Sequence, residues 1–456
     1  MENKTIAAIS TPVGIGGIAV IRLSGDRAIE IADMAYKGKD RLIDAKTHTV
    51  HYGYITDKNS KRIDEVLVTI MKAPRSYTCE DVVEISTHGG IISSRGVLSR
   101  LVELGAYHAQ PGEFTKRAFL NGRIDLSQAE AVIDIINSKT SIARDNALSQ
   151  SNGSLSAKIN AIRNDLVNLA ASMQVIIDYP DEELEDITCE DISKRAKKSS
   201  KEVDRLIMTH ENGKIIKEGI KTVIVGKPNV GKSSLLNLLA GEERAIVTDI
   251  AGTTRDVIEE SINIDGVMLV LTDTAGIRQT EDIVEKIGVE KSLKSIEDAD
   301  LVIVMLESNS LPDNEELELL EKTKNKKRIV VINKTDIKDD SVIEYIKKNI
   351  YDKPIEISVK TQDGTNELTS KIKELYNIGE IGQSEDTLIT NVRHLGALVN
   401  AKEALVRVEQ SIESGMPSDI ASIDINIAID ALGEITGAVV SDDIVSAVFH
   451  DFCVGK

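Results

Sequence analysis

Cysteines and long apolar runs are scarce in this 456-residue sequence, and tryptophan is absent. The three cysteines, Cys79, Cys189 and Cys453, are far apart and odd in number. This pattern excludes a disulfide framework or a zinc site and fits a reducing, cytoplasmic environment. No apolar run reaches about 18 residues, so no membrane span is expected. The first residues also lack the basic-then-apolar form of a signal peptide.

Positive charge is also in short supply. The chain has 55 Lys and Arg against 74 Asp and Glu, a net charge of −19. Residues 1–120 carry 16 basic and 14 acidic side chains, or +2, so the remaining 336 residues carry −21. This excess argues against broad, sequence-blind nucleic-acid binding, and any RNA contact needs a local basic patch. The length predicts two to four domains.

A phosphate-binding loop is the clearest motif that is present. Residues 226–233 (GKPNVGKS) fit the pattern G-x-x-x-x-G-K-[ST]. The apolar run 223–225 before them predicts a buried strand, and residues 234–240 predict a helix, which is the context that the motif requires. Glycines let backbone N–H groups turn toward a phosphate at the positive end of the helix. Lys232 is expected at the β- and γ-phosphates and Ser233 at Mg²⁺.

Three further tetrapeptides follow apolar runs in the order typical of a GTPase. Residues 273–276 (DTAG) can hold Mg²⁺ through water and sense the γ-phosphate. Residues 333–336 (NKTD) place a carboxylate, Asp336, to accept hydrogen bonds from N1 and the 2-amino group of guanine. Adenine lacks that amino donor, so GTP is expected rather than ATP. Residues 357–360 (ISVK) form a weaker base-contacting loop, with Val359 where Ala is usual.

The segment between the phosphate loop and DTAG leaves two interpretations open. Residues 252–256 (GTTRD) can supply Thr254 to the Mg²⁺ shell, or can form a simple turn capped by Thr and Asp. The position after DTAG is Ile277, where Ras-like enzymes carry a Gln that orients water. Water positioning must therefore come from elsewhere, and no arginine finger is evident.

The N-terminal 119 residues predict a mixed α/β domain. Strands are expected at residues 5–9, 17–22, 66–71 and 81–86. Glycines at 14, 16 and 17 could suggest a dinucleotide loop, but their spacing favours a tight turn. His88 is expected to be a loop or capping residue more often than a catalyst. Residues 111–119 predict a loop that enters a helix.

Long helices are expected from about residue 120 onward. Apolar residues recur at helical spacing in 126–136, with later helices at 155–177 and 190–210. The acidic residues 178–183 favour a solvated helix start over a metal site, because consecutive carboxylates do not share a face. Helices at 395–412 and 419–433 suggest that the GTPase is inserted into a helical domain. The tail cysteine, Cys453, is incidental unless the tail folds back into a site.

Essentially the whole chain resembles one family, the tRNA modification GTPases called MnmE or TrmE, within the TrmE-Era-EngA-like GTPases. The resemblance is carried by residues 14–25 (GIGGIAVIRLSG), 77–81 (YTCED), 88–90 (HGG), 111–114 (PGEF), 118–122 (AFLNG), 246–256 (IVTDIAGTTRD), 273–276 (DTAG) and 453–456 (CVGK). Departures are small: Val454 stands where Ile is common, and Cys79 where Gly is common. Cys79 leaves the geometry beside a folate contact open.

The resemblance implies an α/β multidomain fold of three parts. These are an N-terminal α+β domain (1–119) that binds folate and dimerises, a long helical domain (120–215 and 380–456) and an inserted Ras-like P-loop GTPase domain (216–379). It further implies a homodimer that acts with the FAD-dependent partner MnmG on uridine 34 of tRNA. The reaction adds a carboxymethylaminomethyl or aminomethyl group at C5 with the one-carbon unit of a tetrahydrofolate, such as 5-formyl- or 5,10-methylene-tetrahydrofolate. Potassium is expected to promote pairing of GTPase domains and hydrolysis.

Matched residue by residue, the resemblance implies the following sites. The GTP contacts are Asn229, Val230, Gly231, Lys232, Ser233, Ser234, Thr248, Asp249, Ile250, Ala251, Gly252, Thr253, Thr254, Asp273, Thr274, Ala275, Gly276, Asn333, Lys334, Asp336, Ser358, Val359 and Lys360. The Mg²⁺ ligands are Ser233 and Thr254, and the K⁺ cage is formed by Asn229, Thr248, Ile250 and Thr253. Glu285 is expected to orient water. The folate contacts are Arg22, Glu80, Arg123 and Lys456, with Cys453 near the folate in a catalytic role.

Two classes of function remain open at this point. One is the tRNA-modifying GTPase, and the other is a regulatory or assembly GTPase that acts on ribosomes or RNA without modification chemistry. The GTPase motifs fit both classes, whereas the N-terminal 119 residues and the Cys453 tail favour the first. Folate binding by the purified chain discriminates between them.

Overall fold

The computed structural model describes residues 4–178, 188–242, 260–271, 295–350, 352–378, 387–450 and 452–455. The chain divides into two compact units. Unit 1 comprises Met1–Ile133, Leu148–Val203 and Ala397–Lys456, and unit 2 comprises Asp134–Ala147 and Asp204–Gly396. The chain thus leaves unit 1 after residue 203 and returns to it at residue 397.

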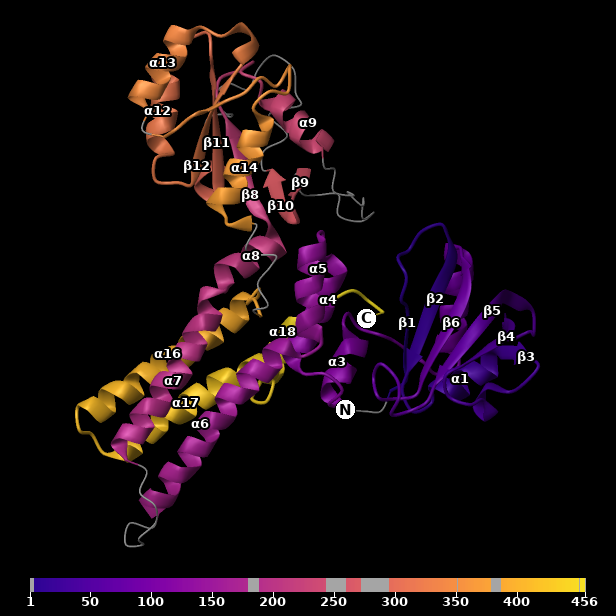
Figure 1. Ribbon diagram of the computed structural model, residues 1–456. Helices are drawn as coiled ribbons and strands as arrows, with labels where there is room; N and C mark the ends of the chain where they lie inside the picture. The colour runs from indigo at the N-terminus through magenta and orange to yellow at the C-terminus, as the bar shows by residue number, and fades with distance from the viewer. Residues whose placement is uncertain are drawn as a thin grey trace. The chain divides into compact units, whose positions relative to one another are not determined.

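A seven-stranded sheet organises the N-terminal part of unit 1 (Figure 1). In spatial order its strands are β3 (Tyr36–Gly38), β4 (Thr49–Thr56), β5 (Arg62–Met71), β6 (Val82–Gly89), β2 (Gly16–Ser24), β1 (Ile6–Ile9) and β7 (Tyr107–His108). All neighbours are antiparallel except β1 and β7. The strands expected from sequence, which are β1, β2, β5 and β6, are confirmed; β3, β4 and β7 were not expected.

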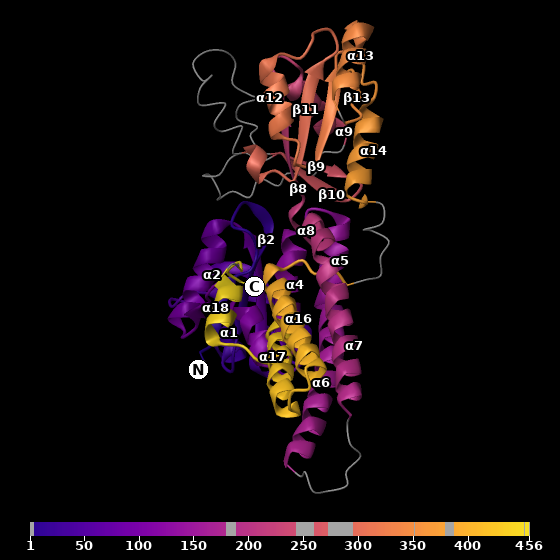
Figure 2. The same cartoon turned by 90° about the vertical axis from the view of Figure 1, so that its left-hand side faces the viewer.

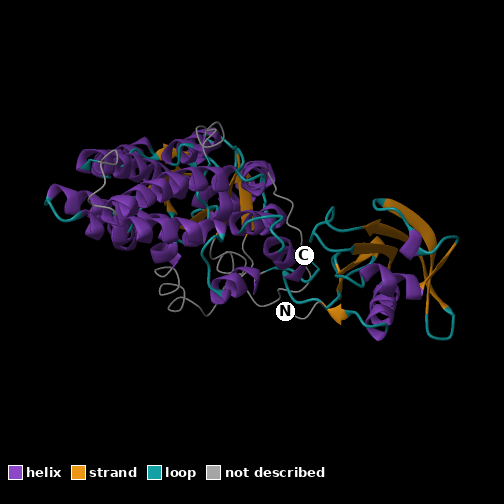
Figure 3. Ribbon diagram, turned by 90° about the horizontal axis from the view of Figure 1, so that it is seen from below, coloured by secondary structure: helices purple, strands orange, loops and turns teal. Residues whose placement is uncertain are grey.

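Two helices cover one face of this sheet. Residues that alternate along β5, such as Val66, Val68 and Ile70, are buried with residues of α1 (Ala28–Ala35) and α2 (Ile91–Glu103). Figure 3 shows these helices on one side of the strands. The alternation of period two that buries one set of side chains exposes the other set. On the opposite face Val50, Tyr52 and Leu67 are exposed.

The glycine-rich segment 14–17 leads into a strand and not into a helix. β1 and β2 pair antiparallel, from Ile6 opposite Ser24 to Ile9 opposite Ile21. The connection between them spans residues 10–15 and includes Gly14, whereas Gly16 and Gly17 begin β2, so no dinucleotide loop forms. His88 was expected in a loop or at a cap, and this expectation was wrong, because His88 lies within β6. Its Nδ1 is 2.7 Å from Oδ1 of Asp64, which raises the pKa of the imidazole.

Helices make up the rest of unit 1 (Figure 2). They are α3 (Glu113–Leu120), α4 (Leu126–Asn137), α5 (Ser141–Ser151), α6 (Ser154–Asp178), α7 (Cys189–Met208), α16 (Val392–Glu413), α17 (Ser418–Thr436) and α18 (Asp442–His450), with α4, α5, α7 and α16 divided between unit 1 and unit 2. The five long helices expected from sequence are confirmed. α6 and α17 run side by side, and α18 contacts α3. Among the described residues, no helix has the length and apolar character needed to cross a membrane.

Unit 2 is built on a six-stranded sheet. Its strands, in spatial order, are β13 (Ile355–Glu356), β12 (Arg328–Asn333), β11 (Leu301–Glu307), β8 (Ile220–Val225), β10 (Val267–Leu271) and β9 (Glu260–Ile264). All neighbours are parallel except β9 and β10. The central strands are buried along nearly their whole length, as expected for a parallel sheet with both faces covered.

Helices cover both faces of this second sheet. Side chains of α9 (Lys232–Glu242) and α14 (Thr365–Leu375) join one core, and those of α12 (Asn314–Lys322) and α13 (Asp340–Asn349) join the other. In such an open α/β sheet, ligands bind beyond the carboxyl ends of the parallel strands. The motifs expected to bind nucleotide follow β8, β12 and β13, and therefore lie at that edge.

Candidate functional site

The phosphate loop connects β8 to α9, as its sequence predicts. Its backbone takes left-handed or related conformations at Gly226 (φ 150°), Asn229 (φ 62°) and Gly231 (φ 108°). A Cβ at Gly226 would lie 2.4 Å from the carbonyl oxygen of Met305, and one at Gly231 would lie 2.3 Å from Nδ2 of Asn333. Both positions therefore require glycine, and the strand and the helix on either side hold the loop in place.

Lys232 begins α9 and folds back over the loop. Its ammonium group donates hydrogen bonds to the carbonyl oxygens of Gly226 and Lys227, each at 2.7 Å. Burial lowers the pKa of this side chain. Ser233 and Ser234 follow in the first turn of α9. A cation and a helix N-terminus thus converge on one loop, which is the arrangement that binds a polyphosphate.

Asn333 ties the phosphate loop to the base-contacting loop. Its Nδ2 donates to the carbonyl oxygen of Val230 at 2.8 Å, and its Oδ1 accepts from the backbone N–H of Val359 at 3.1 Å. Asn333 is 3 % exposed, so its amide acts as a buried brace between the two loops. We expect the main role of Asn333 to be this connection between the two loops, rather than direct contact with the base.

Asp336 follows β12 and contacts the base-contacting loop. Its Oδ1 accepts a hydrogen bond from the hydroxyl of Ser358 at 3.0 Å, and Nζ of Lys360 is 3.8 Å from its Oδ2. Lys334, with φ 66°, pairs with Glu307 at the end of β11. Sequence reasoning missed Glu307. It also missed the ion pairs of Lys227 with Asp313 (3.0 Å) and Glu316 (2.7 Å), which hold the phosphate loop against the start of α12.

Several residues expected from sequence lie outside the described residues. They are Thr248, Asp249, Ile250, Ala251, Gly252, Thr253, Thr254, Asp273, Thr274, Ala275, Gly276, Glu285 and Lys456. The described part of the nucleotide site consists of the phosphate loop, the segment after β12 and the segment after β13. Of the expected K⁺ cage it includes Asn229, and of the expected Mg²⁺ ligands it includes Ser233.

A second group of expected residues gathers around residues 76–81 of unit 1. The guanidinium group of Arg22 lies 5.7 Å from the ring centre of Tyr77, and that of Arg123 lies 4.9 Å from it. Arg123 also donates to the carbonyl oxygen of Tyr77 at 3.2 Å. Arg22 pairs with Glu84, with Nε and Nη2 at 2.8 and 2.7 Å from Oε1. Cation–π packing thus brings both arginines onto one aromatic ring.

Glu80 belongs to the same loop but has different partners. Its Oε2 accepts a hydrogen bond from the hydroxyl of Ser24 at 2.6 Å, and both of its oxygens contact Nη1 of Arg117. Ser24 is also 2.6 Å from the hydroxyl of Thr78, and Asn121 donates to the carbonyl oxygen of Thr78 at 2.6 Å. Sequence reasoning missed Arg117, although it lies in the segment 111–119 that was expected to enter a helix.

The C-terminal tail folds back onto the N-terminal sheet. The carbonyl oxygen of Gly455 accepts hydrogen bonds from the hydroxyl of Ser10 at 3.0 Å and from Nη1 of Arg22 at 3.3 Å. The carbonyl oxygen of Cys453 accepts from the N–H of Gly112 at 3.3 Å. The thiol of Cys453 is free and exposed. This fold-back is the condition that sequence reasoning set for a functional tail.

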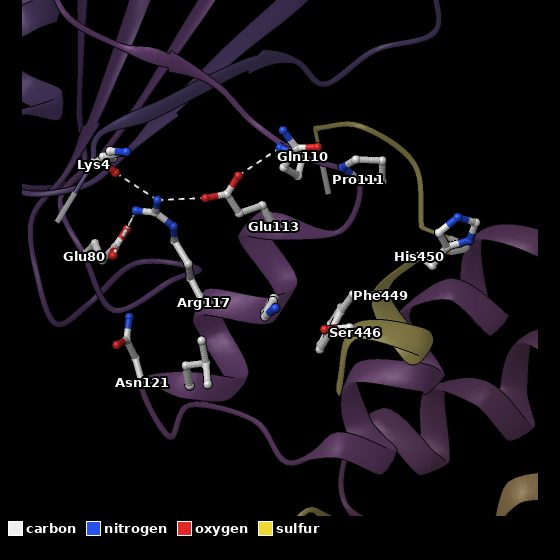
Figure 4. A pocket seen from close by; sticks show the side chains of 12 residues that line it. Lys4, Glu80, Gln110, Pro111, Glu113, Arg117, Asn121, Ser446, Phe449 and His450 are labelled. Carbon is white, nitrogen blue, oxygen red and sulfur yellow. Dashed lines mark hydrogen bonds and ion pairs between the residues drawn. The ribbon is translucent and has the colours of Figure 1, made fainter. Parts of the chain in front are cut away.

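A cavity of about 600 Å³ opens beside Glu80 (Figure 4). Its lining residues are Lys4, Glu80, Gln110, Pro111, Glu113, Lys116, Arg117, Leu120, Asn121, Ser446, Phe449 and His450. Its volume suits a drug-sized ligand. The residues that line it include Glu80 but not Arg22, Arg123 or Cys453, so the expected folate contacts are divided between the cavity and the Tyr77 ring.

Cys79 has a backbone conformation that explains the family's preference at this position. Its φ is 60°, in the left-handed region that glycine adopts without cost. Cys79 therefore adopts a backbone conformation that is typical of glycine, and its side chain is half-buried.

Comparisons with known proteins match nearly the whole chain to one family. The family model described as the MnmE helical domain matches residues 126–453, and the one described as the GTP-binding protein TrmE N-terminus matches residues 5–123. A protein of Acetivibrio thermocellus named tRNA modification GTPase MnmE is 48% identical over 457 residues and covers 100% of both chains. A protein of Lactobacillus acidophilus with the same name is 46% identical over 456 residues and covers 100% of this chain and 99% of its own.

Two solved structures match part of the chain. An Era variant of Aquifex aeolicus bound to GDP and AlF4⁻ is 28% identical, with a TM-score of 0.27, and the match covers 41% of this chain and 66% of that one. The G domain of the T. maritima FeoB iron transporter is 30% identical, with a TM-score of 0.25, and the match covers 34% of this chain and 98% of that one.

Proposed function

The chain belongs to the MnmE family of tRNA modification GTPases, and on that premise we propose that it couples GTP hydrolysis to modification of uridine 34 in tRNA. It is a GTP-hydrolysing enzyme of that family. The proposed product carries an aminomethyl or carboxymethylaminomethyl group at C5 of the uridine. The proposed one-carbon donor is a tetrahydrofolate, and the proposed partner is the FAD-dependent protein MnmG. We place the protein in the cytoplasm, where its tRNA substrate is.

The single observation that carries this proposal is the pairing of two sites in one chain. Unit 2 holds a phosphate loop braced to a base-contacting loop through Asn333, and unit 1 holds the cavity beside Glu80 with the tail folded next to Arg22. A GTPase that only regulates assembly has no need of the second site. The proposed domains are 1–119 for folate binding and dimerisation, 120–215 with 380–456 for the helices, and 216–379 for the GTPase.

The residues of unit 2 fit a guanine nucleotide with Mg²⁺. Gly226 and Gly231 admit no side chain, so the loop backbone can approach phosphates closely. Asp336 has an oxygen besides the one bonded to Ser358, and a carboxylate suits the N1 and 2-amino donors of guanine. Ser233 would hold Mg²⁺, which neutralises charge on the phosphates when bound. Asn229 would contact K⁺, together with Thr248, Ile250 and Thr253.

The residues around residues 76–81 fit a folate. A pterin presents paired N–H donors that match the carboxylate of Glu80, and the glutamate end of a folate suits cations such as Lys4 and Lys116, which line the same cavity. Arg22 and Arg123 lie beside the aromatic ring of Tyr77, and Lys456 is proposed to join them. Cys453 is proposed to act near the bound folate.

A homodimer is proposed through the sheet of unit 1. The face opposite α1 and α2 exposes Val50 at 61 %, Tyr52 at 56 % and Leu67 at 49 %. These residues lie on the paired strands β4 and β5, where Tyr52 is opposite Leu67. An exposed apolar sheet face of this kind is typical of a protein–protein interface.

Calorimetry on the full-length chain tests the proposal. We expect saturable binding of both GTP and 5-formyltetrahydrofolate. Arg22→Ala and Glu80→Ala should weaken folate binding and leave GTP affinity unchanged, because the two sites lie in different units. Lys371→Ala, at a partly exposed position of α14 in unit 2, is the control and should change neither affinity. A chain that binds GTP but no folate would be a regulatory or assembly GTPase instead.

A further inference from the structure

Arg117 contacts both carboxylate oxygens of Glu80, which are the atoms that a ligand with paired N–H donors would contact. Its Nη1 is 3.2 Å from Oε1 and 3.0 Å from Oε2 of Glu80. A single nitrogen almost equidistant from both oxygens makes a forked contact with the carboxylate. Ser24 occupies a third acceptor position at 2.6 Å from Oε2. A carboxylate has about four such positions, so little capacity remains for further donors.

Arg117 also has a second carboxylate within reach. Its Nη2 donates to Oε1 of Glu113 at 2.9 Å and to the carbonyl oxygen of Lys4 at 2.8 Å. Glu113 is itself fixed, because its Oε2 accepts from the N–H of Gln110 at 2.8 Å (Figure 4). The side chains of Arg117, Glu80 and Glu113 are 15 %, 22 % and 22 % exposed. A guanidinium group that leaves Glu80 would therefore keep a paired charge.

We propose that Arg117 competes with the pterin for Glu80, and that folate binding releases Arg117 from Glu80 and leaves it paired with Glu113 alone. The inference rests on the proposed function, in which Glu80 binds the pterin. Two N–H donors that approach both oxygens of Glu80 need the place that Nη1 occupies. Arg117, Glu80 and Glu113 all line the same cavity, which gives the guanidinium group room to move.

The exchange makes Arg117 a residue that sets specificity. A ligand with two adjacent N–H donors replaces both contacts that Glu80 loses, so no acceptor of the carboxylate is left unpaired. A ligand with one donor leaves a partly buried oxygen without a partner, which is costly. Arg117 therefore lowers the affinity for every ligand that uses Glu80, and lowers it most for those without the paired donors of a pterin.

Calorimetry with 5-formyltetrahydrofolate tests the exchange on the full-length chain. Arg117→Gln should bind about three- to tenfold more tightly than the wild type, the scale of one partly exposed ion pair. A 5-formyltetrahydrofolate analogue with methyl in place of the 2-amino group should show a larger gain, because Arg117 disfavours most a ligand that offers Glu80 only one donor. Arg100→Gln, which removes the ion pair with Glu103 from an equally buried arginine of α2 outside the cavity, is the matched control and should leave folate binding unchanged.

Each result has a defined meaning. If folate binding is lost in Glu80→Gln, weaker binding in Arg117→Gln shows that Arg117 positions Glu80, and unchanged binding shows that Arg117 does not compete with the folate. Either result overturns the exchange alone. Unchanged folate binding in Glu80→Gln would show that the pterin does not contact Glu80. It would overturn both this inference and that part of the proposed function. If Arg117→Gln melts early, Arg117→Lys keeps the charge but gives up the shared contact, and a smaller gain in the same direction is expected.

Discussion

At the scale of single residues, Cys79 shows how a backbone angle explains a side-chain preference. A non-glycine residue at φ 60° is strained because its Cβ crowds the backbone. Glycine removes this strain but has more conformational freedom to lose on folding, so the two effects partly cancel. The cysteine is therefore tolerated at this position.

Replacing Cys79 by Gly should stabilise unit 1 by a small amount. We expect a net gain of about 0.5 kcal/mol, the strain relieved minus the extra entropy of glycine. Thermal unfolding of the full-length chain would measure it, with Cys79→Ala as the control, since alanine removes the thiol but keeps the strain. Equal stability of the Ala and Gly variants would mean that the thiol, and not the backbone, decides the effect.

Asp336 should select guanine through its carboxylate. In Asp336→Asn, the amide can still accept the hydrogen bond from Ser358 but no longer offers two acceptors to N1 and the 2-amino group. GTP affinity should fall by about 2–3 kcal/mol, and xanthosine triphosphate, whose 2-oxo group accepts a hydrogen bond, should bind better. Competition with a fluorescent nucleotide would measure both. GTP binding at the wild-type level would exclude Asp336 as the base contact.

At the scale of elements, the tail 452–455 packs closely against the strands β1 and β2. Gly455 has φ 95°, and a Cβ there would lie 2.6 Å from the carbonyl oxygen of Ile9 and 2.8 Å from Cα of Ser10. Only glycine lets the tail lie this close to β1. The same close approach places the carbonyl oxygen of Gly455 beside Arg22.

Gly455→Ala should displace the tail and uncouple the two activities. We expect tRNA modification to fall at least tenfold, as if the last four residues were deleted, because the tail loses its fixed place beside Arg22. GTP affinity should stay unchanged, since the tail belongs to unit 1. Val454→Ala, at a position 53 % exposed, is the control and should retain modification. Full modification by Gly455→Ala would show that the tail need not be held there.

Elements whose signals are local could be predicted from the sequence, and contacts between distant segments could not. The phosphate loop and the segments after β12 and β13 were predicted because each follows a buried strand in a short motif. β4 was missed because it carries Gly53 and exposes Val50 and Tyr52, so neither its composition nor its buried face marks a strand. The contact of Arg117 with Glu80 joins residues 37 positions apart, and no pattern along the chain announces it.

At the scale of the whole molecule, GTP must be hydrolysed without the usual glutamine. Ile277 has no polar atom, and Glu285 is the proposed residue that orients water. Asn229, at φ 62° in the phosphate loop, is proposed to hold K⁺ with the segment 248–253. A cation between the phosphates stabilises charge that develops in the transition state, as an arginine finger does.

Hydrolysis should therefore depend on the monovalent cation and on Glu285. Single-turnover rates should be higher in KCl than in NaCl, because a cage fitted to the larger ion coordinates Na⁺ poorly. Glu285→Ala should lose about 10²-fold or more in rate with little change in GTP affinity. Glu290→Ala, a nearby carboxylate with no proposed role, serves as the control. Equal rates in both salts, or full activity of Glu285→Ala, would assign water positioning to another residue or to the partner protein.

A role in tRNA modification is tested most directly by mass analysis of tRNA nucleosides from cells that lack this gene. We expect uridine 34 to lose its aminomethyl or carboxymethylaminomethyl group at C5. The wild-type gene should restore that group, whereas the variants Glu80→Ala and Asp336→Asn should not, because one removes the proposed folate contact and the other the proposed GTP contact. Unchanged nucleosides in the deletion strain would contradict a role in tRNA modification and leave a GTPase of another kind.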